Sequence, residues 1–309
     1  MKVLFWGTPD FALPPLRALI GEAFDVVGVV TQPDKAVGRS RSTLEAPPVK
    51  KMALEEGIPV FQPEKPKGDE FVAQISALEP DLSVVVAYGH ILSQQIIDLP
   101  AMGTINIHAS LLPKLRGAGP IQASILEGDT ETGVTIMRMV KALDAGPSIL
   151  QVRTPIPDDE TFGELQLRLA EMGALAMIEA LALLSIEQAP ETPQNDAEAT
   201  YAPKIDRSMT RVNWAADSQA IARIIRAFDP KPGAFSQANG SDVKVFGAKL
   251  LPTQSGQPGE VVAIDEGGMT VACGKGAIRI ANVQPAGKRR IAPVEWLRGR
   301  GIAIGARLV

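Results

Sequence analysis

The first 150 residues alternate short apolar runs with amphipathic stretches, and this alternation constrains the fold more than any other feature of the sequence. Such a pattern predicts βα units assembled into a mainly parallel sheet. The predicted class is therefore α/β, with a Rossmann-like N-terminal domain. We expect strands at 3–6, 26–30, 82–87, 104–107, 134–139 and 148–152, and helices at 48–56, 69–78, 120–127 and 161–184.

The composition changes near residue 186. Residues 187–206 are rich in Pro, Glu, Asp and Thr and show no clear period, which is typical of a linker. After a helix expected at 218–228, the remaining chain consists of short β-rich runs separated by glycine and proline, which predicts a smaller OB-like β-barrel domain. The expected domains are thus 1–186 and 207–309, joined by the linker 187–206.

The net charge of −4 conceals an asymmetry between these parts. Residues 1–206 carry a balance of −12, whereas residues 207–309 carry +8. A basic domain attached to an acidic one indicates a polyanionic partner for the C-terminal part. On charge alone, a solvated basic surface explains the balance equally well.

Several classes of protein are disfavoured by what the sequence lacks. Cys273 is the only cysteine, so neither an intramolecular disulfide nor a cluster of cysteine ligands can form. No signal peptide follows Met1, and no run reaches the ~18 apolar residues of a membrane span, which favours a cytoplasmic protein. The first strand is followed by GTPDFA rather than G-x-G-x-x-G, so we expect no nucleotide cofactor.

The segment INIHASLLPKLRGAGPIQ, residues 105–122, marks the expected site. Asn106 and His108 stand two apart at the end of a predicted strand, so their side chains point to the same side. Ligands of open α/β sheets bind at the carboxyl ends of strands. A lone histidine there is more often structural, but the neighbouring asparagine and the turn-rich loop favour a functional role.

Asp144, in VKALDAGPSIL, is the third candidate. Taken alone, an Asp before Ala-Gly is usually a turn former. With Asn106 and His108 it makes a plausible set for acyl transfer, because an amide can donate to an oxyanion, an imidazole can shuttle a proton, and a carboxylate can accept one or tune the imidazole. No serine or cysteine stands beside them as an obvious nucleophile, so direct transfer to an amine is the simpler hypothesis.

The string NIHASLLPKLRGAGPIQASILEGDTETGVTIMRM, followed by LDAGPSIL, resembles the folate-dependent formyltransferase family, and the resemblance extends over essentially the whole chain. It implies Asn106, His108 and Asp144 as catalytic residues, 10-formyltetrahydrofolate as the formyl donor, and no metal. Two positions depart from the family pattern: Pro147 after LDAG, and Lys231 where an aromatic residue is common. The resemblance also implies folate contacts from Tyr88, Gly89, His90, Ile91 and Leu92 and from Ser110, Leu111, Leu112 and Pro113.

Members of the family differ in the formyl acceptor, which is glycinamide ribonucleotide, an amino sugar nucleotide, water, or the α-amino group of methionyl initiator tRNA. The glycinamide enzymes resemble the first domain only, whereas the amino-sugar enzymes share a similar second domain. Residues 35–51 carry a balance of +4 inside an otherwise acidic domain, which favours a nucleic-acid acceptor. The tRNA contacts expected on this basis are Lys35, Arg39, Arg41, Lys50 and Lys51, with Lys288, Arg289 and Arg290 in the second domain.

Two alternatives remain. The basic segment 35–51 could be only a solvated loop, and the chain could be a non-catalytic RNA-binding module with a degenerate enzyme domain. Retention of Asn106, His108 and Asp144 disfavours the second alternative. In the mechanism that the resemblance implies, the methionyl nitrogen attacks the formyl carbon on N10 of the folate, Asn106 and a protonated His108 stabilise the oxyanion, and Asp144 keeps His108 charged.

Overall fold

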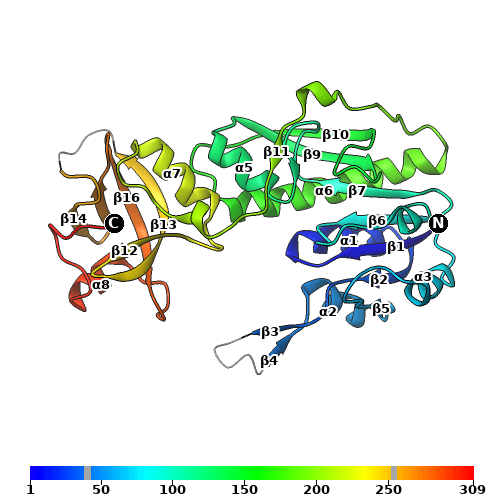
Figure 1. Ribbon diagram of the computed structural model, residues 1–309, viewed down its shortest axis with the longest axis horizontal. Helices are drawn as coiled ribbons and strands as arrows, with labels where there is room; N and C mark the ends of the chain where they lie inside the picture. The colour runs from blue at the N-terminus through cyan, green and yellow to red at the C-terminus, as the bar shows by residue number, and fades with distance from the viewer. Residues whose placement is uncertain (38–42, 252–255) are drawn as a thin grey trace. The chain divides into compact units, whose positions relative to one another are not determined.

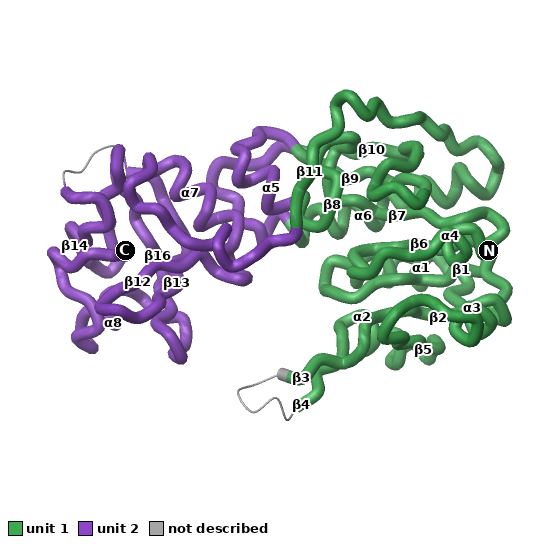
Figure 2. The backbone as a smooth tube through the Cα atoms, in the orientation of Figure 1, with its two compact units in different colours: residues 1–120, 132–154, 166–203 green, residues 121–131, 155–165, 204–309 purple. Residues whose placement is uncertain are grey.

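The computed structural model describes residues 1–37, 43–251 and 256–309 (Figure 1). The chain forms two compact units, which Figure 2 shows in separate colours. Unit 1 comprises residues 1–120, 132–154 and 166–203, and unit 2 comprises residues 121–131, 155–165 and 204–309. The segment expected to be a linker therefore belongs to unit 1 as far as Pro203. The short segments 121–131 and 155–165, although they come early in the chain, belong to unit 2.

Unit 1 is built on a seven-stranded sheet of order β10-β9-β7-β6-β1-β2-β5. The neighbouring pairs β1–β2, β1–β6, β2–β5 and β6–β7 are parallel, and β7–β9 is antiparallel. This arrangement confirms the predicted α/β class. The sheet strands are β1 (Lys2–Gly7), β2 (Asp25–Val30), β5 (Val60–Phe61), β6 (Leu82–Val86), β7 (Thr104–His108), β9 (Glu131–Arg138) and β10 (Ser148–Pro155).

The central strands are almost continuously apolar because helices and loops cover them. Leu4, Trp6, Val30 and Val85 belong to one buried cluster with Tyr88. The helices before residue 130 are η1 (Asp10–Ala12), α1 (Leu13–Gly21), α2 (Pro48–Glu55), α3 (Asp69–Ser76), α4 (Gln94–Ile97) and α5 (Pro120–Glu127). The long helix α6 (Phe162–Ser185) follows β10, and Gly173 of this helix lies against Ile107 of β7.

Three small elements of unit 1 lie outside the main sheet. The strands β3 (Lys35–Val37) and β4 (Thr43–Glu45) pair as an antiparallel hairpin within the basic segment 35–51. A two-stranded parallel sheet pairs β8 (Arg116–Gly117) with β11 (Tyr201–Ala202). The short helix η2 (Asp196–Glu198) precedes β11. This second sheet joins the end of the expected linker to the segment 105–122 that marks the expected site.

Unit 2 is dominated by a five-stranded antiparallel sheet of order β12-β13-β16-β15-β14, in agreement with the predicted small β domain. Its elements after residue 204 are η3 (Ser208–Thr210), α7 (Ser218–Ala227), β12 (Ala234–Ala238), β13 (Ser241–Leu251), β14 (Val261–Asp265), β15 (Gly268–Ala272), β16 (Ala277–Pro285) and α8 (Pro293–Arg298).

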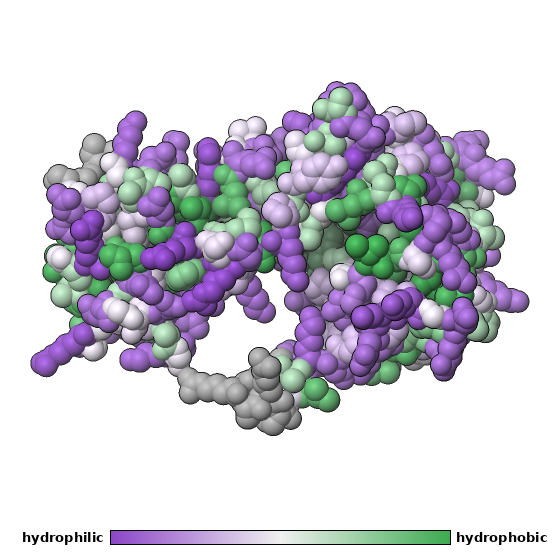
Figure 3. Space-filling model, viewed as in Figure 1, coloured by the Kyte–Doolittle hydropathy of each residue, from purple (hydrophilic) through white to green (hydrophobic). Residues whose placement is uncertain are grey.

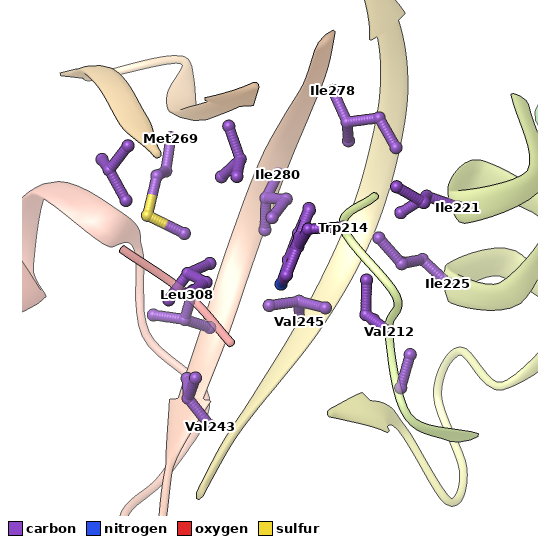
Figure 4. Close-up of a cluster of buried hydrophobic side chains, with 14 of the residues drawn as sticks. Val212, Trp214, Ile221, Ile225, Val243, Val245, Met269, Ile278, Ile280 and Leu308 are labelled. Carbon is purple, nitrogen blue, oxygen red and sulfur yellow. The ribbon is translucent and has the colours of Figure 1, made fainter. Parts of the chain in front are cut away.

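The core of unit 2 forms between α7 and this sheet. Asp217 caps α7 by accepting a hydrogen bond from the amide of Ala220 at 2.8 Å. Ile221 and Ile225, one turn apart, both face inward, as helical spacing requires. Figure 4 shows them opposite Trp214 and the sheet residues that complete the cluster, which include Val243, Val245, Ile278 and Ile280.

The outer surface is mainly hydrophilic on the face shown in Figure 3, where apolar residues form smaller patches. Within the described ranges 1–37, 43–251 and 256–309, no helix combines the length and the apolar character needed to cross a membrane.

Candidate active site

Asn106 and His108 occupy the carboxyl end of β7, in the middle of the seven-stranded sheet of unit 1. In the sheet register, Asn106 pairs with Val85 of β6 and with Met137 of β9. Asn106 is half-buried, whereas His108 is only 5% exposed. The two polar side chains share one side of the strand, at the edge where ligands of open α/β sheets bind.

The imidazole of His108 lies between a backbone carbonyl and a carboxylate. Its Nε2 is 3.0 Å from the carbonyl oxygen of Leu115, and its Nδ1 is 3.7 Å from Oδ2 of Asp144. Because a carbonyl can only accept a hydrogen bond, the hydrogen of the neutral ring is assigned to Nε2. The lone pair of Nδ1 then faces Asp144.

Burial lowers the pKa of His108 below its ordinary value, and this effect outweighs the Asp144 carboxylate and the Leu115 carbonyl, which both favour the charged ring. Burial therefore disfavours the imidazolium in the free protein, whereas Asp144 favours it. The protonated His108 of the mechanism that the resemblance implies depends on the balance of these two effects. The pattern of residues indicates the neighbouring carboxylate but not the loss of hydration around the ring.

Asp144 is held in place by the backbone of β8. The amide of Gly117 donates a hydrogen bond to Oδ2 of Asp144 at 2.8 Å. Gly117 has a φ of +117°, and a Cβ atom there would lie 2.5 Å from the carbonyl oxygen of Ala202 on β11. Only glycine therefore fits at this position, and it brings the amide to the carboxylate. Asp144 itself is in the left-handed region, with a φ of +48°.

The turn Ser110–Pro113, which the sequence assigned to folate contacts, is fixed from below by two side chains. The hydroxyl of Thr135 on β9 donates to the Ser110 carbonyl at 2.7 Å and accepts from the Leu112 amide at 3.1 Å. Nε2 of Gln151 on β10 donates to the Leu112 carbonyl at 2.6 Å. Ser110 Oγ donates to the carbonyl of Lys114 at 2.6 Å. Leu111 and Pro113 are half-buried.

The other expected folate segment, Tyr88–Leu92, follows β6. The Tyr88 carbonyl accepts hydrogen bonds from Thr8 Oγ1 at 3.0 Å and from Gln32 Nε2 at 3.1 Å. Tyr88 and Leu92 are buried in the core cluster of unit 1, and burial raises the pKa of Tyr88 to about 12. Gly89 and His90 are exposed, and Ile91 is 86% exposed. The side chains of His90 and Ile91 are thus exposed to a ligand in this loop, whereas the side chain of Leu92 is buried.

The lysines of the basic segment 35–51 differ in exposure and in ion pairing. Lys35 and Lys51 are exposed. Lys50 is paired with Asp34 at 2.8 Å, and Asp34 also accepts a hydrogen bond from Gln62 at 2.7 Å. These contacts lower the pKa of Asp34 and keep the pair charged. Arg39 and Arg41 lie outside the described residues.

The expected basic run of unit 2 is also divided. Lys288, Arg289 and Arg290 are all exposed, and Arg289 approaches Glu295 at 3.7 Å. Arg290 contacts the buried Asp229 at 3.2 Å, and its guanidinium lies 4.0 Å from the centroid of the Phe246 ring. Arg290 therefore contributes to the packing of unit 2. The sequence of three consecutive basic residues does not indicate this role.

Several residues that shape the site were not found from the sequence. They are Leu115, Arg116, Thr135, Gln151, Gln194 and Thr200, all linked by hydrogen bonds to the predicted residues or to their partners. Most act through backbone groups or lie far away along the chain, so no spacing of residue types marks them. Gln194 and Thr200 fall in the segment whose composition indicated a linker.

In the part of the chain that the structure describes, no group of three or more His, Cys, Asp and Glu side chains is arranged to hold a metal ion. Cys273 lies in the second unit, where burial raises the pKa of its thiol to about 11. It is therefore an unreactive core residue.

The fold and the Asn106, His108 and Asp144 cluster correspond to one class of enzyme. A family model described as "Formyl transferase" matches residues 1–181, and one described as "Formyl transferase, C-terminal domain" matches residues 204–301. Among solved structures, HypX from Aquifex aeolicus in complex with tetrahydrofolic acid superposes with a TM-score of 0.70 at 20% identity, covering 98% of this chain and 48% of that one.

Two curated relatives match at nearly full length. The methionyl-tRNA formyltransferase of Moorella thermoacetica is 44% identical, covering 97% of this chain and 96% of the relative. That of Methylococcus capsulatus is 45% identical, covering 100% of this chain and 99% of the relative. The chain belongs to the methionyl-tRNA formyltransferase family.

Proposed function

We propose that this chain transfers the formyl group of 10-formyltetrahydrofolate to the α-amino group of methionyl initiator tRNA, giving N-formylmethionyl-tRNA in the cytoplasm. The observation that carries the proposal is the pairing of His108 with Asp144 beside Asn106 at the carboxyl end of β7. The full-length relatives named above support the choice of acceptor, and the folate bound by HypX supports a folate donor.

In this reaction the amine nitrogen forms a bond to the formyl carbon, and the bond from that carbon to N10 of the folate then breaks. The proton that the amine loses is balanced by the one that N10 gains. Neutral His108 can carry this proton on Nδ1, where the Asp144 carboxylate 3.7 Å away stabilises the imidazolium that forms. His108 thus becomes charged during the reaction rather than before it.

Asn106 supplies a second function. Its side-chain amide can donate a hydrogen bond to the oxygen of the tetrahedral intermediate, where negative charge develops. Loss of one such donor costs about 2.7–4 kcal/mol in enzymes where it has been measured. Asn106 lies on β7 between β6 and β9, so the backbone that carries this donor is held in place before substrate binds.

The proposed folate site consists of two segments whose backbones are held by hydrogen bonds. The turn 110–113 is fixed by Thr135 and Gln151, and the loop 88–92 is fixed through the Tyr88 carbonyl. Ile91, which projects into solvent, provides an apolar surface suited to a flat ring. When bound, the folate supplies an activated formyl group on N10.

For the tRNA we assign contacts to Lys35, Arg39, Arg41 and Lys51 of the basic segment and to Lys288 and Arg289 of unit 2. The exposure of Lys35, Lys51, Lys288 and Arg289 supports phosphate contacts. Lys50 and Arg290 remain part of the proposed tRNA surface. Because Asp34 and Asp229 already pair with their charges, we expect these two residues to contribute less to tRNA binding.

The proposal is tested by following labelled formyl from 10-formyltetrahydrofolate into methionyl initiator tRNA. Uncharged tRNA, glycinamide ribonucleotide and an amino sugar nucleotide serve as competing acceptors. We expect transfer to the charged tRNA alone. Transfer to the sugar nucleotide at a higher kcat/KM, or no transfer with Asn106, His108 and Asp144 intact, would overturn the assignment.

A further inference from the structure

Residues 191–202, called here the 191–202 segment, contact both ends of the loop that carries Asp144. Arg138, just before that loop, donates a hydrogen bond from Nε to Glu191 Oε1 at 2.7 Å. Ser148, just after it, exchanges two backbone hydrogen bonds of 2.9 Å with Thr192. The two ends of the loop are thereby held against one short stretch of chain.

Gln194 reaches the middle of the same loop. Its Nε2 donates to the carbonyl oxygens of Asp144 at 2.8 Å and of Gly146 at 2.7 Å. Its Oε1 accepts from Nε and Nη2 of Arg116 at 3.0 and 2.8 Å. A guanidinium has only donors and a carbonyl oxygen only accepts. These four hydrogen bonds therefore fix the orientation of the Gln194 side-chain amide. Arg116 is buried and is itself held by Asp196 at 2.7 Å.

The far end of the 191–202 segment supports the partner of His108. Thr200 Oγ1 accepts a hydrogen bond from the amide of Leu115 at 2.8 Å, and the Thr200 carbonyl accepts from the amide of Arg116 at 2.9 Å. Leu115 presents its carbonyl to His108. One segment therefore holds the backbone on both sides of the His108–Asp144 pair.

We propose that Gln194 is a positioning residue for the transfer reaction: by bonding the Asp144 and Gly146 carbonyls it fixes the Asp144 carboxylate relative to His108. The need for such support follows from the backbone. Asp144 has a φ of +48°, in the left-handed region, which aspartate enters more readily than most residues with a side chain but still at a cost in free energy that the surrounding hydrogen bonds offset. The test of this role by kcat rests on the proposed function. The effect of Gln194 on the surroundings of His108 can be measured without any formyl transfer.

The decisive variant is Gln194→Glu. It keeps the size of the side chain and an oxygen for Arg116, but it removes both donors to the Asp144 loop. Because Gln194 contacts neither substrate in the proposed reaction, we expect kcat to fall ~10- to 100-fold while the KM for each substrate stays within ~3-fold. Gln194→Asn carries the same groups on a shorter arm and should retain more activity than Gln194→Glu.

Gln188→Glu is the matched control. Gln188 is exposed and lies earlier in the same connection, so the substitution makes the same change of charge away from the site. Its kcat should equal that of the unmodified protein. If Gln188→Glu slowed the reaction as much as Gln194→Glu, a general charge effect would replace the positioning role.

A second measurement does not depend on catalysis. The chain contains only two histidines, so NMR of histidine-labelled protein gives two imidazole spin systems, which a His90→Gln variant assigns. We expect Gln194→Glu to shift the His108 signals and to leave those of His90 unchanged. Unchanged His108 signals, or an unchanged kcat, would overturn the proposal. If Gln194→Glu does not fold, the kinetics and the NMR are measured on Gln194→Asn instead. We again expect kcat to fall and the KM for each substrate to stay nearly unchanged. Failure of the unmodified protein to formylate methionyl-tRNA would count against the proposed function alone.

Discussion

Nε2 of His108 donates a hydrogen bond to the carbonyl oxygen of Leu115, seven residues further along the chain, at 3.0 Å. This bond sets the tautomer of the neutral ring and turns its other nitrogen toward Asp144. The turn between the two residues is thus part of the proposed catalytic geometry and also a proposed folate contact. A backbone carbonyl cannot be removed by mutation, so the pair is best tested through His108 and Asp144 themselves.

His108→Ala and Asp144→Asn should each lower kcat by at least ~100-fold with little change in the thermal unfolding temperature. Asparagine is the appropriate replacement at position 144, because it tolerates the left-handed backbone found there. His90→Ala is the comparison: His90 is exposed and belongs to the proposed folate loop 88–92 but has no role in the proton transfer, so kcat should fall far less. Equal losses in the two histidine variants, measured as initial rates of formyl transfer, would remove His108 from the proposed mechanism.

Stability should depend on pH through His108. Burial depresses the pKa of His108 in the folded protein below the value of about 6.5 that it has in the unfolded chain. The resulting contribution to the free energy of unfolding is fully present above that value. It is lost as pH falls through the folded-state pKa, because the unfolded chain binds the proton more readily. Urea unfolding of the unmodified protein and of His108→Gln between pH 5 and 8 should show a smaller loss toward acid in the variant, whereas parallel curves would contradict the shift.

Two neighbouring aliphatic residues should behave differently when truncated. Ile91→Ala should raise the KM for the folate and leave stability nearly unchanged, because Ile91 is 86% exposed. Leu92→Ala should lower the free energy of unfolding by about 2–5 kcal/mol, because Leu92 is 3% exposed and lies in the core cluster of unit 1. Steady-state kinetics with each substrate varied, together with urea unfolding, separates the two effects. A folate KM that responds to Leu92→Ala but not to Ile91→Ala would place the ring elsewhere.

The basic run 288–290 should likewise divide into two kinds of residue. A Lys288→Ala/Arg289→Ala double variant should weaken tRNA binding and flatten the slope of log K against log salt by somewhat less than ~1 for each phosphate that the variant no longer neutralises. Arg290→Ala should instead destabilise the protein by about 1–3 kcal/mol, because it leaves Asp229, which is only 6% exposed, without its cation. Binding measured at four salt concentrations provides the check. A salt slope unchanged in the double variant would mean that the tRNA binds to another face of unit 2.

The sequence predicted the elements that follow from hydrophobic periodicity. The strand containing Asn106 and His108, the helix 120–127 and the long helix near 161–184 all form within one or two residues of the expected bounds. Local spacing also placed Asn106 and His108 on one side of their strand. These features depend on the residues nearest in the chain, which is why the sequence alone was sufficient.

What the sequence missed depends on contacts between distant segments. Thr135 and Gln151 are ordinary strand residues until β9 and β10 bring them beneath the turn 110–113. Lys50 and Arg290 look like free cations until Asp34 and Asp229 are found beside them. The lowered pKa of His108 arises from burial, which the order of residues in the sequence does not show.

The placement of Gln194 and Thr200 has a consequence for chimeric proteins made by exchanging second domains between relatives. With a junction at residue 187, where the composition changes, residues 194 and 200 would come from the other parent together with its second domain. The chimera would then lose Gln194, the donor to the Asp144 carbonyl, and Thr200, the acceptor for the Leu115 amide. A junction after Pro203, where unit 1 ends, would leave them in their native partnership. Chimeras spliced at the later point should therefore inherit the turnover rate of the parent that supplies the first 203 residues.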